Sequence, residues 1–183
     1  MRTPASPLLT VEHALLGFIY ERPVHGYEIY QQLSAPDGLW QVWRLKQAQL
    51  YALLAKLEEH GYILADVQPQ AARPPRKMYT LTAKGRAAYL SWLHGPVAHG
   101  RQMRIEFLAK LYFACRQGPA AANALLAQQT AACEQWLAHL RRQPPAAPQE
   151  MFAYAVQQFR INQVESFLAW LAACRDHLRE EVV

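Results

Sequence analysis

The segment KQAQLYALLAKLEEHGYI, residues 46–63, constrains the fold of this chain more than any other part of the sequence. Four leucines recur at the spacing of one helical face: Leu50, Leu53, Leu54 and Leu57. Small residues occupy the opposite face, and Gly61 is typical of a helix end that leads into a strand. Taken alone, the pattern also fits an ordinary amphipathic helix in which alanine only favours helicity. The flanking sequence has to decide between these interpretations.

Composition restricts the class of protein. The chain has 183 residues with 52% hydrophobic content, which suits one large or two small domains with a packed core. No apolar run reaches the roughly 18 residues of a membrane span, and the N-terminus lacks the pattern of a secretory signal. The three cysteines, Cys115, Cys133 and Cys174, are an odd number in apolar surroundings and predict reduced core residues. We therefore expect a cytoplasmic protein that is not attached to a membrane, with no metal and no cofactor.

The charges are distributed unevenly. Net charge is +5, and no acidic residue lies between Asp66 and Glu106. This acid-free interval holds seven basic residues, Arg73, Arg76, Lys77, Lys84, Arg86, Arg101 and Arg104. Such a tract suits a polyanion, of which nucleic acid is the common case, although a solvated surface without carboxylates has the same composition.

Two shorter helices precede the leucine-bearing segment. Thr10 is the predicted N-cap of the first, with Glu12 in the first turn, and this helix should end before Pro23. Residues 26–33, GYEIYQQL, predict a second helix, whose N-terminus at Gly26 suits a phosphate group or close packing. Residues 39–45 predict a short strand or an extended approach to the third helix.

A hairpin and a further helix follow. Residues 62–68 and 76–82 are rich in strand-forming residues and are separated by the proline-rich PQAARPP segment. Thr82 is then the predicted N-cap of a helix that ends at Gly95-Pro96. Three helices, a hairpin and a helix within residues 1–95 predict a winged helix-turn-helix domain, mainly α with a small β-hairpin wing. In this architecture the third helix enters the DNA major groove and the wing follows the backbone.

Four motifs carry a resemblance to a known family. They are LTVEHALLGFI at 9–19, HGYEI at 25–29, QLYALLAKLEEHGYI at 49–63 and RKMYTLTAKG at 76–85. Together they resemble the PadR family of transcriptional regulators over about the first half of the chain. The sequence departs from the family where a Ser or Thr often opens the recognition helix, because Arg44-Leu45-Lys46 stands there. The resemblance implies DNA binding and, in longer members, a helical C-terminal domain that forms dimers.

Residues 96–183 have a different character. They predict helices separated by Gly118-Pro119 and by the proline-rich segment after Gln143. The last predicted helix has apolar residues on more than one stripe, so it must bury against something. A second copy of the chain would cover it, which predicts a C-terminal α-helical dimerisation domain. A self-contained three-helix bundle is the alternative.

Candidate DNA contacts follow from the predicted fold. Phosphate contacts are expected from Lys46, Lys56, Arg73, Arg76 and Lys77. Gln47 and Gln49 have amides suited to adenine, and Tyr51 is either a phosphate contact or a half-buried packing residue. The predicted function is a transcriptional regulator, a repressor in the first instance. It would bind a pseudo-palindromic operator in double-stranded DNA as a homodimer. The alternative is a winged-helix module for protein interaction that does not read DNA.

A small aromatic effector is the last expectation. Five tryptophans are many for this length, and some relatives of the PadR type bind planar aromatic ligands. Trp92 and Trp136 are the candidates for such a pocket, although tryptophan on an apolar stripe is usually part of the core. No nucleophile elbow, phosphate-binding glycine loop or pair of carboxylates at catalytic spacing is present, so the sequence does not predict an enzyme.

Overall fold

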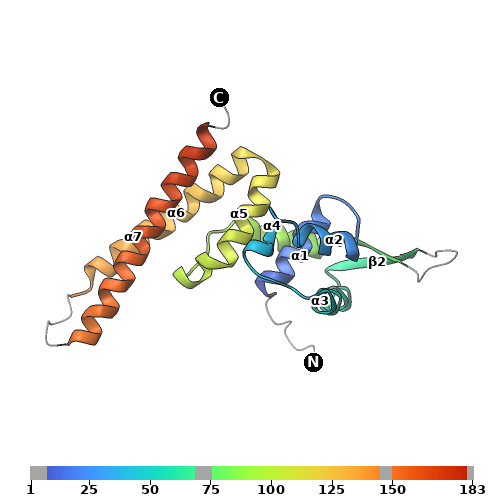
Figure 1. The fold of residues 1–183 in the computed structure, drawn as a ribbon, viewed down its shortest axis with the longest axis horizontal. Coiled ribbons are helices and arrows are strands. Elements are labelled where there is room, and N and C mark those ends of the chain that lie inside the picture. Colours follow the sequence, from blue (N-terminus) through green and yellow to red (C-terminus); the bar gives the residue numbers. More distant parts are fainter. Residues whose placement is uncertain (1–7, 69–75, 145–149, 181–183) are drawn as a thin grey trace. The chain divides into compact units, whose positions relative to one another are not determined.

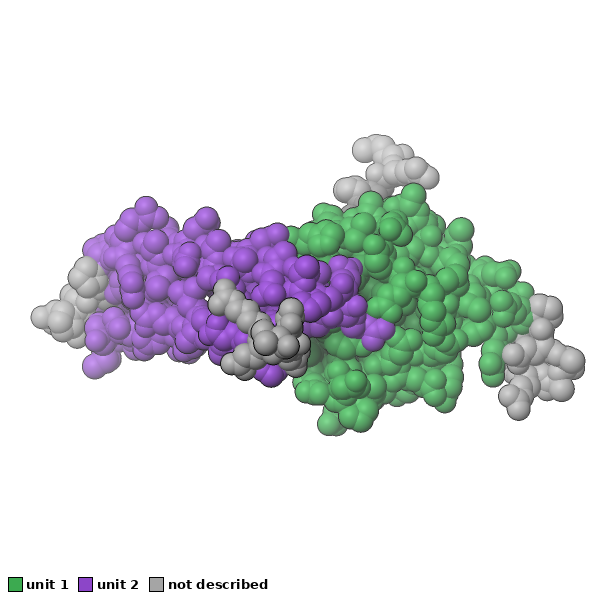
Figure 2. Space-filling view, turned by 90° about the horizontal axis from the view of Figure 1, so that it is seen from above, with its two compact units in different colours: residues 1–94, 108–113 green, residues 95–107, 114–183 purple. Residues whose placement is uncertain are grey.

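The computed structural model describes residues 8–68, 76–144 and 150–180, and it divides the chain into two compact units. The first unit comprises residues 1–94 and 108–113, and the second comprises residues 95–107 and 114–183 (Figure 2). The middle of one helix, residues 108–113, therefore packs with the N-terminal unit although the residues on either side of it belong to the other.

The first unit has the predicted element order with two additions. Its elements are α1 (Thr10–Tyr20), β1 (Val24–His25), α2 (Gly26–Leu33), η1 (Leu39–Gln41), α3 (Gln47–Glu59), β2 (Ile63–Gln68), β3 (Arg76–Leu81) and α4 (Ala83–Leu93) (Figure 1). The winged helix-turn-helix architecture is thus confirmed. Of the two alternatives for residues 39–45, the strand is wrong, because η1 is a single 3₁₀ turn. Residues 43–46 have no regular structure and lead into α3, which fits the alternative of an irregular approach only for this last part.

Helix α1 begins one residue earlier in the chain than predicted. Leu9, with extended backbone angles, is the N-cap residue, and Thr10 is already helical. The carboxylate of Glu12 accepts the backbone N–H of Leu9 at 2.7 Å, which satisfies a donor that the first turn would leave unpaired. The predicted Thr10 cap is therefore wrong, because the acid of the first turn caps the helix from within.

Aromatic rings form the core between α1, α4 and residues 108–113 of α5 (Glu106–Gln117). The ring of Phe113 lies edge-on to Phe18 at 5.2 Å and to Tyr89 at 5.8 Å. Gly17 is required for this packing, since a Cβ there would lie 2.6 Å from the Phe113 ring. The close approach of α1 to this ring explains why a helix interior carries glycine despite its cost of roughly 1 kcal/mol.

The sheet has the order β1-β3-β2, with antiparallel neighbours. Strands β2 and β3 pair from Ile63 opposite Leu81 to Gln68 opposite Arg76, as the predicted hairpin requires. β1 has only two residues and was not predicted from the sequence.

The base of the hairpin is fixed by Thr82, the confirmed N-cap of α4. Its hydroxyl oxygen accepts the N–H of Gly85 at 3.0 Å and lies 2.8 Å from the carbonyl oxygen of Gly61. Gly61 has a φ of 70°, which is the left-handed conformation expected where α3 ends and β2 begins.

The second unit is helical. It contains η2 (Gly100–Arg104), the ends of α5, α6 (Pro119–Arg142) and α7 (Met151–Glu180). Helices α6 and α7 run side by side, and Arg141 pairs with Glu165 at 2.7 Å between them (Figure 1). The fully buried Gln129 amide accepts the N–H of Val97 at 2.8 Å and so ties the segment before η2 to α6.

Several large apolar side chains of α7 remain exposed. Phe152 is 83% exposed, Phe159 63% and Met151 71%, whereas Val164 and Leu171 are buried. Helix α6 therefore covers only part of the apolar surface of α7.

The cysteines only partly follow the sequence prediction. Cys133 is buried, and burial raises the pKa of its thiol, whereas Cys115 is exposed and not part of the core. None of the three is in a disulfide. In the part of the chain that the structure describes, no helix is both long enough and apolar enough to cross a membrane.

Candidate nucleic-acid interface

Helix α3 has one fully buried side and one exposed side. Leu50 and Leu54 are completely inaccessible and Leu57 is 1% exposed, so three of the four leucines of the predicted stripe belong to the core. Leu53 is half-buried at its edge. The residues that begin the helix, 46–49, are all exposed, and so are Ala52 and Ala55. The outer surface of α3 therefore carries polar side chains at its start and small side chains beyond it.

The first turn of α3 is capped by its own glutamine. Gln49 Oε1 accepts the backbone N–H of Lys46 at 3.0 Å. This bond satisfies the N–H of the N-cap residue itself. A Ser or Thr at position 46 would instead accept an N–H from the first turn, for which the ammonium group of Lys46 has no acceptor. The bond to Gln49 also uses one of the two acceptor positions on the Gln49 carbonyl oxygen, while Gln47 forms no comparable cap.

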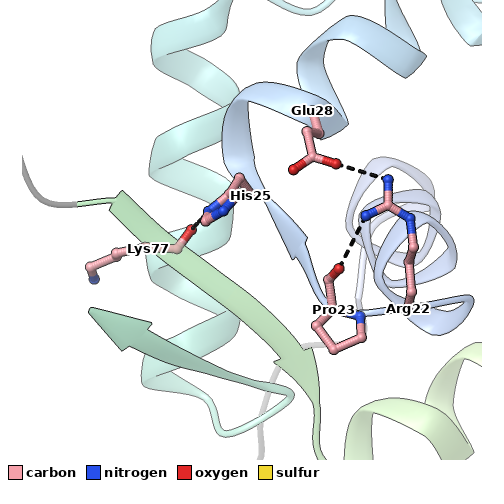
Figure 3. A network of polar contacts seen from close by, with 5 residues as sticks. All are labelled: Arg22, Pro23, His25, Glu28 and Lys77. Atoms are coloured by element: carbon pink, nitrogen blue, oxygen red, sulfur yellow. Dashed lines mark hydrogen bonds and ion pairs between the residues drawn. The ribbon is translucent and has the colours of Figure 1, made fainter. Parts of the chain in front are cut away.

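A hollow of about 370 Å³ adjoins α3. It is lined by residues of the α2 N-terminus, of α3 and of β3, namely His25, Gly26, Tyr27, Glu28, Tyr51, Arg76, Lys77 and Tyr79. His25 Nδ1 lies 3.1 Å from the carbonyl oxygen of Lys77, and because a carbonyl can only accept, Nδ1 is the donor (Figure 3). This bond joins the start of α2 to the wing.

An ion pair lies close to this hydrogen bond, at the start of α2. Arg22 Nη2 lies 2.8 Å from Glu28 Oε2, and another nitrogen of the same guanidinium contacts the carbonyl oxygen of Pro23 (Figure 3). The hydrogen bond from Arg22 holds the pKa of Glu28 below its usual value. Arg22 thereby compensates the acid in the hollow, and the other charged residues of the lining are Arg76 and Lys77.

Tyr51 is partly packed and partly exposed, as the packing alternative from the sequence expects. Its side chain is 41% exposed, yet its ring packs against Gly26, where a Cβ would lie 2.7 Å from Tyr51 Cε1. Gly26 is therefore needed for close packing of α2 on α3. The exposed part of Tyr51 lies at the mouth of the hollow.

Most lysines and arginines near α3 and the wing have partners within the chain. Lys56 Nζ lies 2.7 Å from Glu12 Oε1, and Lys77 Nζ lies 2.9 Å from Glu58 Oε2. The ammonium group of Lys84 lies 4.1 Å above the Tyr62 ring and the guanidinium of Arg86 lies 4.7 Å from the Tyr20 ring. The acid-free tract therefore presents fewer unpaired charges than its sequence suggests.

The remaining predicted site residues lie in different places. Arg76 is exposed as the first residue of β3, and Arg73 falls outside the described residues. Trp92 is 8% exposed in the first unit and stacks on His13 at 5.2 Å, so it belongs to the aromatic core. Trp136 lies in the second unit, where it lines a separate hollow.

Sequence reasoning missed three participants in this region. Glu58, Tyr79 and the buried carboxylate of Glu12 each contact a predicted site residue or line the hollow. Of these three residues, only Tyr79 was indicated by the sequence. Its alternation with Met78 in the predicted strand places the two side chains on opposite faces of the sheet. The ion pairs Glu12–Lys56 and Glu58–Lys77 depend on how α3 packs on α1 and on β3, which the sequence pattern does not specify.

Two family profiles match separate parts of the chain. The profile of the "Transcriptional regulator PadR-like family" matches residues 15–90, which hold β1 to β3 completely and most of α1 and α4. Residues 15–90 are thus a PadR-like domain. A second profile, "Virulence activator alpha C-term", matches residues 103–179.

Named relatives are regulators of transcription. The negative transcriptional regulator PadR of Bacillus subtilis is 32% identical over 105 residues, which are 56% of each chain. A probable transcriptional regulator of Mycobacterium tuberculosis is 27% identical over 96 residues, 52% of this chain and 50% of the relative. The chain thus spans about half the length of the curated relatives it matches. These names support a role other than that of an enzyme.

A solved structure is also among the proteins that align with this chain. Bacillus subtilis PadR in complex with operator DNA is 24% identical, with 94% of this chain and 99% of that chain covered and a TM-score of 0.46.

We predict that Tyr79 makes the PadR-like fold sensitive to alkali. Burial, with smaller contributions from Glu58 and Tyr51, raises the pKa of Tyr79 to about 12 from 10. The unfolded chain therefore loses this proton first, so the stabilisation is complete below about pH 10 and declines as the pH rises towards 12. Chemical unfolding measured from pH 8 to 12 should show this decline, and Tyr79→Phe should reduce it. Identical pH profiles for both proteins would contradict the prediction.

Proposed function

We propose that this chain is a DNA-binding transcriptional repressor that binds a pseudo-palindromic operator as a homodimer. The observation that carries the proposal is the start of α3. Residues 46–49 are exposed there, next to a hollow whose wall includes Arg76 and Lys77. A helix that buries its leucines and exposes its first turn can enter the major groove without disturbing the core.

In this proposal Gln47, Gln49 and the nearby alanines face the base edges, and the hollow faces a phosphate group. Glutamine amides pair with adenine, and alanine methyl groups contact the methyl group of thymine. Lys46 and Arg76 are the leading candidates for phosphate contacts. Both are exposed, and neither forms an ion pair with another of the described residues. Tyr51 and Lys77 would complete the phosphate contact from the mouth and the wall of the hollow.

Repression, and the assignment of DNA binding and dimerisation to different parts of the chain, are also proposals. The negative regulator from Bacillus subtilis, 32% identical over its matched part, supports repression. Residues 1–95 would bind DNA and residues 96–183 would form the dimer. A protein-interaction module without DNA binding is the competing function, and salt-dependent DNA binding separates the two.

The first test is the salt dependence of DNA binding. Fluorescence anisotropy with a duplex from the gene's own upstream region gives the slope of log affinity against log salt. We expect Lys46→Gln and Arg76→Gln each to reduce the magnitude of this slope by about 0.9, because each removes one phosphate contact. Arg142→Gln, which removes an exposed charge from the second unit, is the control and should leave the slope unchanged. Salt-insensitive binding by the unaltered protein would instead favour the competing function.

The proposed dimer rests on the uncovered part of α7. Phe152, Phe159 and Met151 are each more than 60% exposed, which is costly for side chains of this size in water. A second copy can bury this surface symmetrically, and a two-fold axis in the protein would match the symmetry of a palindromic site.

We expect Phe159→Glu to shift the protein from dimer to monomer, because the new carboxylate would have to be buried without a partner at the interface. Analytical ultracentrifugation over a range of concentrations measures this directly. Leu64→Glu changes another exposed apolar residue, 61% accessible in β2, and serves as the matched control. Equal sedimentation of the unaltered protein and both variants would contradict the proposed interface.

A small aromatic effector is proposed to bind the second unit. A hollow of about 630 Å³ lies between η2, α6 and α7, and its lining includes Trp136, Arg101 and Arg160. An aromatic ring can stack on the indole while the guanidinium groups attract an acidic substituent. Release of DNA would follow from a change in the spacing of the two α3 helices of the dimer.

Tryptophan fluorescence tests this site with benzoate and cinnamate as probes. Saturable quenching is expected in the unaltered protein and in Trp92→Phe, whose tryptophan is in the aromatic core, but not in Trp136→Phe. Addition of the probe should also weaken DNA binding. Quenching that survives in Trp136→Phe would place the ligand elsewhere.

A further inference from the structure

The carboxylate of Glu12 is a buried charged group of the first unit that the proposed function does not use. Glu12 is completely inaccessible to solvent, although α1 is near the start of the chain. One oxygen accepts the N–H of Leu9 at 2.7 Å, and the other lies 2.7 Å from Lys56 Nζ on α3. The carboxylate therefore joins two helices, one of which is the proposed reading helix.

We propose that Glu12 and Lys56 form an ion pair that fixes the orientation of α3 for DNA reading, and that Lys56 does not contact phosphate. Lys56 is thus a positioning residue and not a ligand of DNA. The inference rests on the proposed function for its readout, because orientation of α3 matters only if α3 reads DNA.

The energetics favour a pair over a phosphate contact. A carboxylate without contact to water is strongly destabilised unless a cation or several hydrogen bonds compensate it. Among the described residues, no directed hydrogen bond reaches Glu12 Oε1, so the ammonium group of Lys56 is its compensation. If Lys56 turned towards DNA, this oxygen would be left buried and unpaired. A lysine without a buried partner gives up no comparable ion pair when it binds a phosphate.

The position of Lys56 explains why sequence analysis assigned it to DNA. It follows Gln49 by seven residues, or about two helical turns, which places both on one side of α3. The side chain of Lys56 is 46% exposed, so its aliphatic part lies along the surface while its ammonium group reaches the buried acid. Helical periodicity gives the side of a helix, but it does not give the direction of a long flexible side chain.

The two ends of α3 are consequently held by different contacts. Gln49 caps the first turn at Lys46, and Glu12 holds the helix about ten residues later through Lys56. The leucines between these points hold α3 against the core. They still permit small rotations and shifts of the helix, because apolar contacts are not directional. A directed ion pair removes this freedom, and base reading requires side chains positioned within about 0.5 Å.

The test compares four variants in the full-length chain. They are Lys56→Gln, Lys56→Arg, Glu12→Gln and, as the matched control on the same helix, Lys46→Gln. Anisotropy with the upstream duplex and with a scrambled duplex of equal length gives the affinity, the specificity ratio and the salt slope of each. Measurements are made well below the melting temperature of each variant, which circular dichroism supplies.

We expect Lys56→Gln to reduce the specificity ratio about tenfold while the salt slope stays unchanged. Lys56→Arg should retain the ratio, because the guanidinium keeps the charge opposite Glu12. Glu12→Gln keeps an acceptor for the Leu9 N–H but removes the charge, so it should lower the ratio as Lys56→Gln does. Lys46→Gln should instead reduce the magnitude of the slope by about 0.9. If Lys56→Gln does not fold, Glu12→Gln carries the test alone.

Two outcomes would overturn the inference. A reduced slope in Lys56→Gln, with equal losses on both duplexes, would make Lys56 a phosphate contact. Full specificity in Glu12→Gln would make the pair merely structural. Failure of the proposed function has a separate signature, because the unaltered protein would then bind neither duplex in a salt-dependent way.

Discussion

Burial of one narrow side of α3 is the constraint on which the rest of the first unit depends. Leu50, Leu54 and Leu57 are withdrawn from water while residues 46–49 remain exposed. Helices α1 and α2 and the base of the hairpin supply the apolar surface that receives these leucines. Gly26 keeps α2 close enough to do so, and Gly61 turns the chain directly into β2. The exposed side of α3 can differ in chemistry between proteins without altering this core.

The sequence predicted those parts of the fold that depend on local chemistry. The leucine spacing located α3, the Thr82 cap located α4, and the two strand-rich segments located the hairpin. The two-residue strand β1 was missed because it exists only through its pairing with β3, more than fifty residues later in the chain. The N-cap of α1 was misplaced by one residue, because Thr10 is already helical and the Glu12 carboxylate accepts the N–H of the actual N-cap residue, Leu9.

The candidate site was less predictable than the fold. Exposure of Gln47 and Gln49 follows from helical periodicity, and the structure agrees. The partners of Lys56, Lys77, Lys84 and Arg86 do not follow, because each lies on another element or on an aromatic ring. Counting basic residues in a sequence therefore overstates the charge available to DNA. The tryptophans show the same difficulty, since only packing separates Trp92 in the core from Trp136 beside a hollow.

The sheet order β1-β3-β2 leaves β2 at an edge, with one row of backbone groups that no strand of the described residues covers. Such an edge is a template for a strand from another molecule, particularly where apolar side chains accompany it. Leu64 and Val67 are 61% and 55% exposed on this strand. Asp66, which lies between them, is the only charged residue of β2. Charge on an edge strand discourages uncontrolled pairing, so Asp66 is the side chain of β2 that opposes the addition of a foreign strand.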